Sequence, residues 1–369
     1  MEAEIRVGAS VSLTGRYALQ GRQAEAGLRL WAADANREGG LPVGQARRRV
    51  HLVIHDDEGR ADRLEANLAR LLDQEEVDVL FGPYGSDLAL RAVRLAAARG
   101  RTLWNHAGAS DAIPLAAPHA VVNGIAPASA YFEALPGSLR STDPGFDRLA
   151  VLYSASGTFG GFVASGAAEA ARAAGIRAVA VFPFAPPLAD RKEVLAQVRA
   201  WQPQAVICAG RFEDDVWLAR RREALGAGAP LLAAVGAGLT AFGAAAGPAA
   251  EGVVGPSHWE PAPDVGRRPP GFAAGFVRAN GETPEYPAAL AYALGEVLAA
   301  CAGRAGRLEA AALREAADAL RFSTLIGRFR LDAQSGRQVG YRPLLVRWER
   351  GVKRVIWRAP SPPDPDPAK

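Results

Sequence analysis

The sequence contains little cysteine, little lysine and no long apolar run, and each shortage argues against a class of protein. Its two cysteines, Cys208 and Cys301, lie in an apparent strand and an Ala-rich helix, which predicts buried free thiols rather than a disulfide. No stretch of about 18 uninterrupted apolar residues exists, so no transmembrane helix is predicted. Arginine is scattered beside aspartate and glutamate, so the net charge of +4 does not predict nucleic-acid binding.

The sequence also lacks the motifs of common catalytic and metal sites, including G-x-x-x-x-G-K-[ST], H-E-x-x-H, C-x-x-C and G-x-S-x-G. His51 and His55 share a strand face but stand about 13 Å apart along the strand, too far for one metal ion. Asp56 and Asp57 end a strand, where carboxylates more often cap the following turn than carry out acid–base chemistry. The Gly-rich turn at 157–161 does not fit G-x-G-x-x-G. We therefore expect no enzyme activity, no metal and no cofactor.

What the chain does have is a regular alternation of strands and helices. Residues 4–12 alternate apolar and polar side chains, and the next segment carries a helical apolar stripe that ends at Gly39 and Gly40. The same rhythm restarts near Leu149. Two successive series of this kind predict an α/β fold with two doubly wound lobes, each built on a parallel sheet.

The end of the chain does not continue the second series. Helices predicted at 287–302 and 308–320 favour a return of the chain to the first lobe, and a hairpin-like antiparallel segment at 341–351 comes last. The expected crossovers lie near Asn123, Val254 and Arg328. The expected parts are 1–122 with 256–327 for the first lobe, 123–255 with 328–358 for the second lobe, and a Pro-rich disordered tail at 359–369.

Three strand-to-helix turns of the first lobe could bind an anion, at residues 13–20, 82–86 and 107–110. Ser86 and Ser110 stand at expected helix caps, and simple capping, worth about 1 kcal/mol each, explains either one alone. As a pair on neighbouring strands, they would present two hydroxyls, backbone N–H groups and positive helix ends to a carboxylate. A carboxylate needs less neutralisation than a polyphosphate, which agrees with the lack of lysine in these turns.

Several longer segments together resemble a known family. They are "VGASVSLTGRYALQGRQAEAGLRLWAADANREGGLPVG", "VHLVIHDDEGRADRLEANLARLL" and "VDVLFGPYGS", followed by "GTFGGF", "AAEGVVG" and "TLIGRFRLDAQSG". They resemble the type I periplasmic binding proteins, and within them the leucine/isoleucine/valine-binding branch, the extracytoplasmic receptors of ABC importers. The similarity covers nearly the whole chain. Its motifs are specific for the family and not for the ligand.

The resemblance implies a ligand site between the lobes. In the first lobe it implies that Ser86 and Ser110 hydrogen-bond the ligand carboxylate and that neighbouring backbone assists. The implied first-lobe residues are Tyr17, Gln20, Tyr84, Ser86, Gly108, Ala109 and Ser110.

In the second lobe the resemblance implies that Phe159 closes over the ligand. Arg211 and Phe212 match a position that is frequently tyrosine in the family. Val235 falls where the amino-acid binders carry the acid that pairs with the ligand ammonium. Because a buried ammonium needs such a partner, we expect a carboxylate without a tightly recognised α-amino group, aromatic or dicarboxylic. Branched-chain amino acids are the alternative.

Two functions follow from this reading. The first is a monomeric periplasmic receptor that delivers a small carboxylate ligand to the membrane subunits of an ABC permease, its signal peptide lying outside this sequence. The second is a cytoplasmic ligand sensor on the same fold. The N-terminus enters a strand at once, so the genomic sequence upstream of Glu2 decides between them. An enzyme remains only as a third reading, if a catalytic group lies in the cleft.

Overall fold

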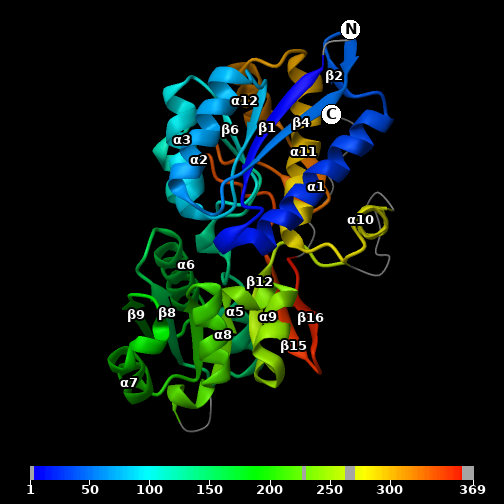
Figure 1. Ribbon diagram of the computed structural model, residues 1–369. Coiled ribbons are helices and arrows are strands. Elements are labelled where there is room, and N and C mark those ends of the chain that lie inside the picture. Colours follow the sequence, from blue (N-terminus) through cyan, green and yellow to red (C-terminus); the bar gives the residue numbers. More distant parts are fainter. Residues whose placement is uncertain (1–3, 227–229, 262–270, 360–369) are drawn as a thin grey trace.

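The computed structural model describes residues 4–226, 230–261 and 271–359, which form two α/β lobes (Figure 1). The first lobe lies at the top of Figure 1 and the second lobe at the bottom, and each has its own sheet. The predicted fold class is therefore confirmed. The tail expected at 359–369 lies, apart from Ala359, outside the described residues.

The first lobe is built on a five-stranded sheet in which all neighbouring strands are parallel. In spatial order its strands are β4 (Val50–Asp56), β1 (Ile5–Val11), β5 (Val79–Phe81), β6 (Leu103–Asn105) and β7 (Val121–Asn123). Its helices are α1 (Ala18–Arg37), α2 (Ala61–Ala69), α3 (Ser86–Ala98), α4 (Ala112–Ala116), α10 (Phe272–Asn280), α11 (Tyr286–Ala305) and α12 (Ala310–Ala319). Two short antiparallel pairs complete it, β2 (Leu41–Val43) with β3 (Ala46–Arg48) and β13 (Phe322–Thr324) with β14 (Gly327–Phe329).

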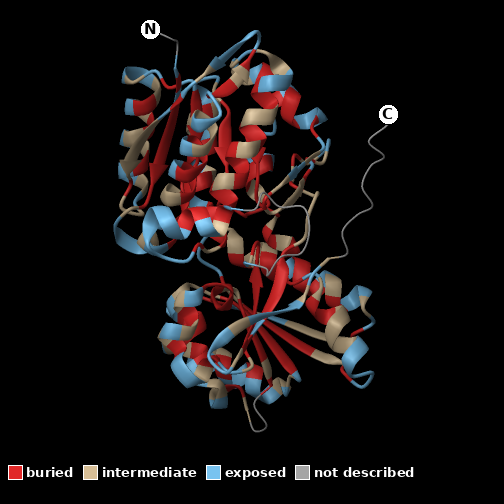
Figure 2. Ribbon diagram, turned by 90° about the vertical axis from the view of Figure 1, so that its right-hand side faces the viewer, coloured by how far each residue is buried: buried red, intermediate tan, exposed pale blue. Residues whose placement is uncertain are grey.

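Apolar side chains cover both faces of this sheet. Leu28 of α1 and Leu294 of α11 share a buried cluster with Val7 of β1. On the other face, Leu68 of α2 packs in a cluster with Leu80 of β5. Figure 2 shows the buried residues running through the sheets and the inner sides of the helices. Burial on both faces is the reason that the strands read as continuous apolar runs in the sequence.

The second lobe is built on a seven-stranded sheet. In spatial order its strands are β16 (Val352–Trp357), β15 (Leu344–Glu349), β12 (Val254–Ser257), β11 (Leu231–Ala234), β10 (Ala205–Ala209), β8 (Arg148–Ser154) and β9 (Ala178–Phe184). Its helices are α5 (Leu135–Thr142), α6 (Phe159–Ala173), α7 (Lys192–Trp201), α8 (Phe212–Arg220) and α9 (Thr240–Ala246). The strands from β8 to β12 are parallel, whereas β15 and β16 form the expected antiparallel hairpin at one edge. Cys208 and Cys301 are buried free thiols, as predicted.

The chain passes between the lobes three times. The first crossing follows β7 at residues 124–127, the second follows β12 at His258, and the third lies at residues 339–343, before β15. The boundaries expected at 255/256 and 327/328 fall inside strands, because β12 pairs with β15 as far as Ser257 and β14 pairs with β13. The pairing of β12 with the distant β15 leaves no mark on the local sequence pattern.

The long helix α11 returns to the first lobe and packs directly on α1 (Figure 1). Glycine allows this close approach: a Cβ on Gly27 would lie 2.2 Å from the carbonyl oxygen of Ala288, and one on Gly295 would lie 2.2 Å from the ring of Trp31. Among the described residues, α11 is the one helix long and apolar enough to cross a membrane. Its most apolar stretch is 67% buried inside the structure, which suits a core helix equally well.

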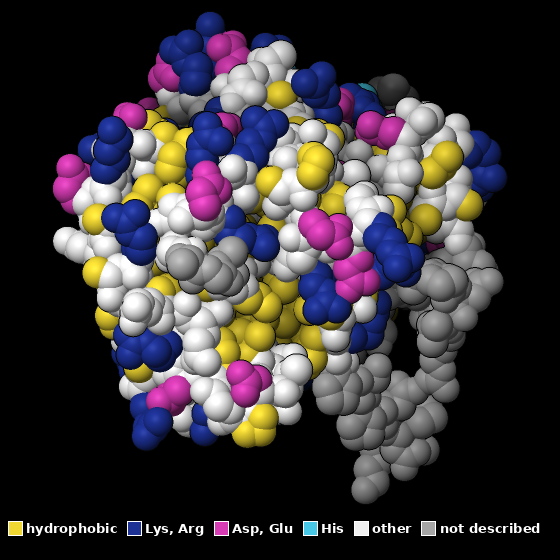
Figure 3. All heavy atoms as spheres, turned by 90° about the horizontal axis from the view of Figure 1, so that it is seen from below, with side chains coloured by type: hydrophobic (Ala, Val, Ile, Leu, Met, Phe, Trp, Pro, Cys, Tyr) yellow, Lys and Arg dark blue, Asp and Glu magenta, His cyan; other side chains and the backbone are white. Residues whose placement is uncertain are grey.

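The outer end of the second lobe, seen in Figure 3, carries charges of both signs. Lysine and arginine are interspersed with aspartate and glutamate, and apolar side chains lie in the hollow between them. The described part of this face therefore offers no continuous positive surface of the kind that a nucleic-acid backbone requires.

We expect Gly295→Ala to destabilise the protein by about 1–3 kcal/mol, because the added methyl group would push the buried Trp31 ring away from α11. Gly137→Ala in α5 is the matched control, since a Cβ there meets nothing within 4 Å and alanine favours a helix by up to about 1 kcal/mol. Urea denaturation of both variants measures the difference. Equal stability of the two variants would contradict the proposed role of this glycine in helix packing.

Candidate functional site

A cleft opens between the lobes and encloses about 1080 Å³ of empty space, including the part that is open to solvent. Its first-lobe wall comes from the segments that follow β1, β5 and β6, and its second-lobe wall from those that follow β8, β10 and β11. These are the carboxyl ends of parallel strands, where helix N-termini point and where ligands of open α/β sheets bind. The cleft is therefore the candidate site.

The first-lobe wall centres on the N-terminus of α3. The expected residues that line it are Tyr17, Gln20, Tyr84, Ser86 and Ala109. Ser86 is the first residue of α3 rather than its cap, because Gly85 occupies the cap position with φ of 93°. Glycine suits this position, since it adopts positive φ easily and a Cβ there would lie 3.1 Å from the Tyr17 ring. The N–H groups of the first turn of α3 thus open onto the cleft.

The loop after β6 places alternate residues at the cleft. Ala107 and Ala109 line it, whereas Gly108 and Ser110, also expected at the site, lie behind the lining. Asn105 fixes this arrangement, because its side chain accepts a hydrogen bond from the Gly108 N–H (2.8 Å) and donates one to the Gly108 carbonyl (2.7 Å). Within the described residues the Ala109 N–H has no partner. The loop therefore offers the Ala109 amide, and not that of Gly108, to a ligand.

Ser110 serves contacts between protein groups. Its N–H donates to the Ser86 hydroxyl (3.1 Å), and its own hydroxyl lies 2.7 Å from the hydroxyl of Thr158 in the second lobe. The two predicted serines are thus neighbours, but only Ser86 faces the cleft.

The lobes also touch at two other points. The Asp87 carboxylate of the first lobe packs so closely on Gly157 of the second that a Cβ on Gly157 would lie 2.5 Å from its oxygens. The Thr240 N–H, in the second lobe, donates to the Glu285 carboxylate of the first lobe (2.8 Å), 3.8 Å from the Lys353 ammonium. The structure therefore represents a closed arrangement of the lobes.

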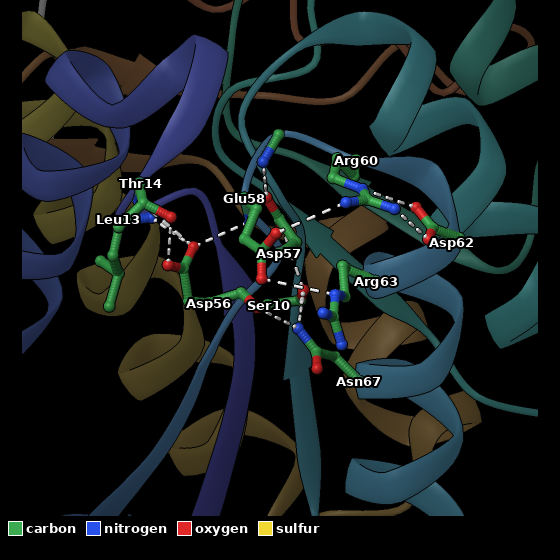
Figure 4. Close-up of polar contacts among 11 residues, drawn as sticks. Ser10, Leu13, Thr14, Asp56, Asp57, Glu58, Arg60, Asp62, Arg63 and Asn67 are labelled. Carbon is green, nitrogen blue, oxygen red and sulfur yellow. Dashed lines mark hydrogen bonds and ion pairs between the residues drawn. The ribbon is translucent and has the colours of Figure 1, made fainter.

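Asp56 and Asp57 hold the loop that carries Tyr17 (Figure 4). The Asp56 carboxylate accepts hydrogen bonds from the N–H groups of Leu13 (2.9 Å) and Glu58 (2.8 Å). The Asp57 carboxylate accepts hydrogen bonds from the Ser12 hydroxyl (2.5 Å) and, more weakly, from that of Ser10 (3.2 Å). These carboxylates accept their hydrogen bonds from β1 and from neighbouring turns, so the pair has the structural role expected from the sequence.

All four expected second-lobe residues, Phe159, Arg211, Phe212 and Val235, line the cleft. The last three are positioned by acids at the start of α8. The Asp214 carboxylate accepts hydrogen bonds from the N–H groups of Arg211 (3.1 Å) and Leu188 (2.6 Å), so Asp214 caps the helix. Asp214 therefore has a structural role beside the cleft.

Asp215 is a cleft residue that the sequence analysis missed. It is 1% exposed, and its two carboxylate oxygens accept hydrogen bonds from the N–H groups of Gly210 (3.2 Å) and Gly236 (2.7 Å). Burial raises the pKa of Asp215 to about 7, against the effect of these hydrogen bonds. The side chain connects the ends of β10 and β11 through these hydrogen bonds. A run of three acids at a helix start gave no signal that Asp215 is both buried and part of the cleft lining.

Arg211 is the half-buried cation of the cleft. Its Nε atom is buried and has no hydrogen-bond partner, and its guanidinium forms no ion pair within the described residues. Apart from the buried Asp215, the other ionisable side chains of the lining, Arg16, Asp87 and Glu213, are exposed. A buried donor without a partner is costly, so an acceptor supplied by a ligand would stabilise this side chain.

Aromatic rings complete the cleft. Tyr17 and Tyr84 contact each other from the first lobe (ring centroids 5.6 Å apart), and Tyr131 meets Phe159 edge-on (5.4 Å). Burial raises the pKa of Tyr84 to about 12, so its hydroxyl stays protonated. Tyr131 and Tyr286 were not predicted, because they reach the cleft only through the crossings of the chain. Trp104 and Trp259 are buried in the core and do not line the cleft.

Comparisons with known proteins agree with this geometry. The family model described as periplasmic binding protein matches residues 4–351. A leucine-binding protein from Thermotoga maritima superposes with a TM-score of 0.82 at 18% identity, covering 95% of this chain and 97% of that one. A solute-binding protein of an ABC transporter from R. palustris, in complex with benzoate, has a TM-score of 0.78 and 22% identity, covering 97% of each chain. A branched-chain amino acid transporter substrate-binding protein from Streptococcus pneumoniae, in complex with isoleucine, has a TM-score of 0.81 and 18% identity, covering 96% and 98%. At these identities the structures establish the shared fold alone.

The raised pKa of Asp215 predicts a pH dependence of stability. Its pKa in the folded protein, about 7, exceeds the unfolded value of about 3.9, so folding takes up a proton between these values. The contribution of Asp215 to the free energy of unfolding is therefore most favourable below about pH 4 and declines as the pH rises towards 7. We expect Asp215→Asn to remove this decline, so that the variant gains on the order of 1–3 kcal/mol relative to wild type between pH 5 and pH 8.

Denaturant titrations at the two pH values measure this difference and cancel any constant cost of the substitution. Glu213→Gln, two residues away on the exposed rim, is the matched control and should follow the wild type. A constant difference between Asp215→Asn and wild type at both pH values would refute the assignment.

Proposed function

Because the chain belongs to the periplasmic binding protein family, we propose that it is an extracytoplasmic receptor of an ABC importer that captures a small carboxylate-bearing ligand between its lobes. The family consists of solute-binding proteins, so the chain is a binding protein and not an enzyme. The observation that carries the choice of ligand is Arg211, a half-buried cation in the cleft whose Nε has no partner.

The first lobe supplies the proposed carboxylate anchor. The Ser86 hydroxyl and the N–H groups at the start of α3 face the cleft, and the Ala109 N–H beside them lacks a partner among the described residues. The positive end of the 13-residue helix α3 favours negative charge at this point. Of the residues expected to hold the carboxylate, Ser86 and Ala109 are thus proposed to touch it directly, while Ser110 and Gly108 support them.

The second lobe disfavours an ammonium group. Val235 lines the cleft and provides no charge, and both oxygens of Asp215 already accept hydrogen bonds from backbone N–H groups. An ammonium buried there without a full counter-charge would be costly, whereas an anionic or accepting group would meet Arg211. The proposed ligand is therefore a carboxylate without a tightly bound α-amino group, aromatic or dicarboxylic. The rings of Tyr131, Phe159 and Phe212 suit an aromatic body.

The partners and the location follow from the same proposal. The receptor would act as a monomer in the periplasm and pass its ligand to the membrane subunits of the permease. Closure of the lobes needs no chemistry, because a ligand that contacts both walls binds the closed arrangement more tightly than the open one. A signal peptide encoded upstream of this sequence would support the location, and a cytoplasmic sensor would lack it.

A thermal-shift panel tests the ligand class. Benzoate, 4-hydroxybenzoate and succinate are compared with leucine and valine at matched concentrations. A ligand present at 100 times its Kd adds about 2.7 kcal/mol of stability. We expect a clear rise in Tm with at least one of the three acids and none with leucine or valine. Strong stabilisation by leucine or valine alone would overturn the proposed class and favour a branched-chain amino acid.

Substitutions test the site. With the acid that gives the largest shift, Ser86→Ala and Arg211→Gln should each weaken binding by about 1–3 kcal/mol in calorimetry, as expected for hydrogen bonds that involve a charged group. The matched controls are Ser165→Ala and Arg172→Gln on α6, away from the cleft. Unchanged affinity in both cleft variants would remove the site from consideration.

A further inference from the structure

The three crossings between the lobes converge on one side chain. Tyr341, in the third crossing, accepts a hydrogen bond from the Ala126 N–H of the first crossing at 2.9 Å. The same hydroxyl lies 2.9 Å from Nδ1 of His258, at the second crossing. Because the hydroxyl oxygen accepts from Ala126, its proton is available for an unprotonated Nδ1. A single hydroxyl therefore connects all three crossings between the lobes.

The ring of His258 lies between aromatic rings from both lobes. Tyr131, from the second-lobe side of the first crossing, contacts it edge-on at 5.1 Å between ring centroids. Tyr286, the first residue of α11 in the first lobe, lies 5.3 Å away. Both tyrosines line the ligand cleft, and His258 itself does not. The histidine ring therefore lies between a residue of each cleft wall, directly behind the space for the ligand.

In the closed arrangement His258 and Ala126 are shielded from solvent, while the Tyr341 side chain is partly exposed. His258 is 3% exposed, Ala126 is 0% exposed, and the Nε2 atom of His258 is buried without a partner among the described residues. Burial lowers the pKa of His258 to about 3, which keeps the ring neutral. A rotation that moved Tyr131 away from Tyr286 would admit water to the ring between them.

We propose that Tyr341 and His258 form a hinge lock, which sets the balance between the closed and open arrangements without touching the ligand. Loss of the Tyr341 hydroxyl would leave the Ala126 N–H and His258 Nδ1 buried without partners while the lobes are closed. In the open arrangement water can replace the missing hydroxyl, so the cost falls on the closed arrangement. The lock is independent of which ligand the cleft takes.

Tyr341→Phe tests the lock in the ligand-free protein, so the result does not depend on the proposed ligand. Small-angle X-ray scattering reports the separation of the lobes. Hydrogen exchange of the Thr240 amide reports the closed contact, because that N–H donates to Glu285 across the lobes. We expect a larger radius of gyration and roughly tenfold faster exchange at Thr240, the change that follows from one lost hydrogen bond.

Tyr292→Phe is the matched control. It also removes a tyrosine hydroxyl bond, 3.0 Å long, but the partner is Asp34 on α1, within the first lobe. This variant should lose stability while its scattering curve and its Thr240 exchange stay those of the wild type. The lock is refuted if Tyr341→Phe leaves both readouts unchanged, or if Tyr292→Phe changes them equally.

A second variant covers the case in which Tyr341→Phe does not fold. His258→Asn keeps a polar atom near the position of Nδ1 but removes the ring that fills the space between Tyr131 and Tyr286. It should open the protein in the same two measurements. A closed scattering curve and wild-type Thr240 exchange in this variant would also refute the lock.

Discussion

The contact between α1 and α11 is the constraint on which the rest of the molecule depends. The first sheet is covered on one face by α1 and by a helix that belongs to the last quarter of the chain, and the two meet with glycine at the closest points. Since β15 and β16 then extend the second sheet, the chain has to pass between the lobes three times. Three parallel connections allow bending about one axis and resist most other movements, and this is what a cleft that opens and closes requires.

The two walls of the cleft are made in different ways. In the first lobe, a helix N-terminus, the Ser86 hydroxyl and the Ala109 N–H, which has no partner among the described residues, stand beside the rings of Tyr17 and Tyr84. In the second lobe, long side chains dominate, with Arg211 and the rings of Phe159 and Phe212. A fixed backbone wall recognises a group that every ligand of a class shares, whereas side chains can vary between relatives without disturbing the fold.

The sequence predicts the fold well because the signals for it are local. Buried parallel strands, helical stripes and turn glycines each show within a dozen residues, and the loop aspartates Asp56 and Asp57 have the structural role expected of them. The site is only partly predictable. Motifs located Ser86, Arg211 and Val235, but Tyr131, Asp215 and Tyr286 face the cleft because of contacts between distant segments. Gly108 lies behind the lining because Asn105 holds its backbone, and no spacing rule reveals that bond.

The distant origin of α11 has a consequence for the synthesis of the protein. A ribosome completes α1, with Leu28 and Trp31 on its apolar face, long before it reaches the helix that will cover them. At about 5–20 residues per second, that face waits on the order of ten seconds or more for its partner. The middle of the second lobe, from β8 to β12, is contiguous in the chain and can assemble in the meantime. Both lobes are therefore completed only by the last part of the chain, since the second sheet also needs β15 and β16.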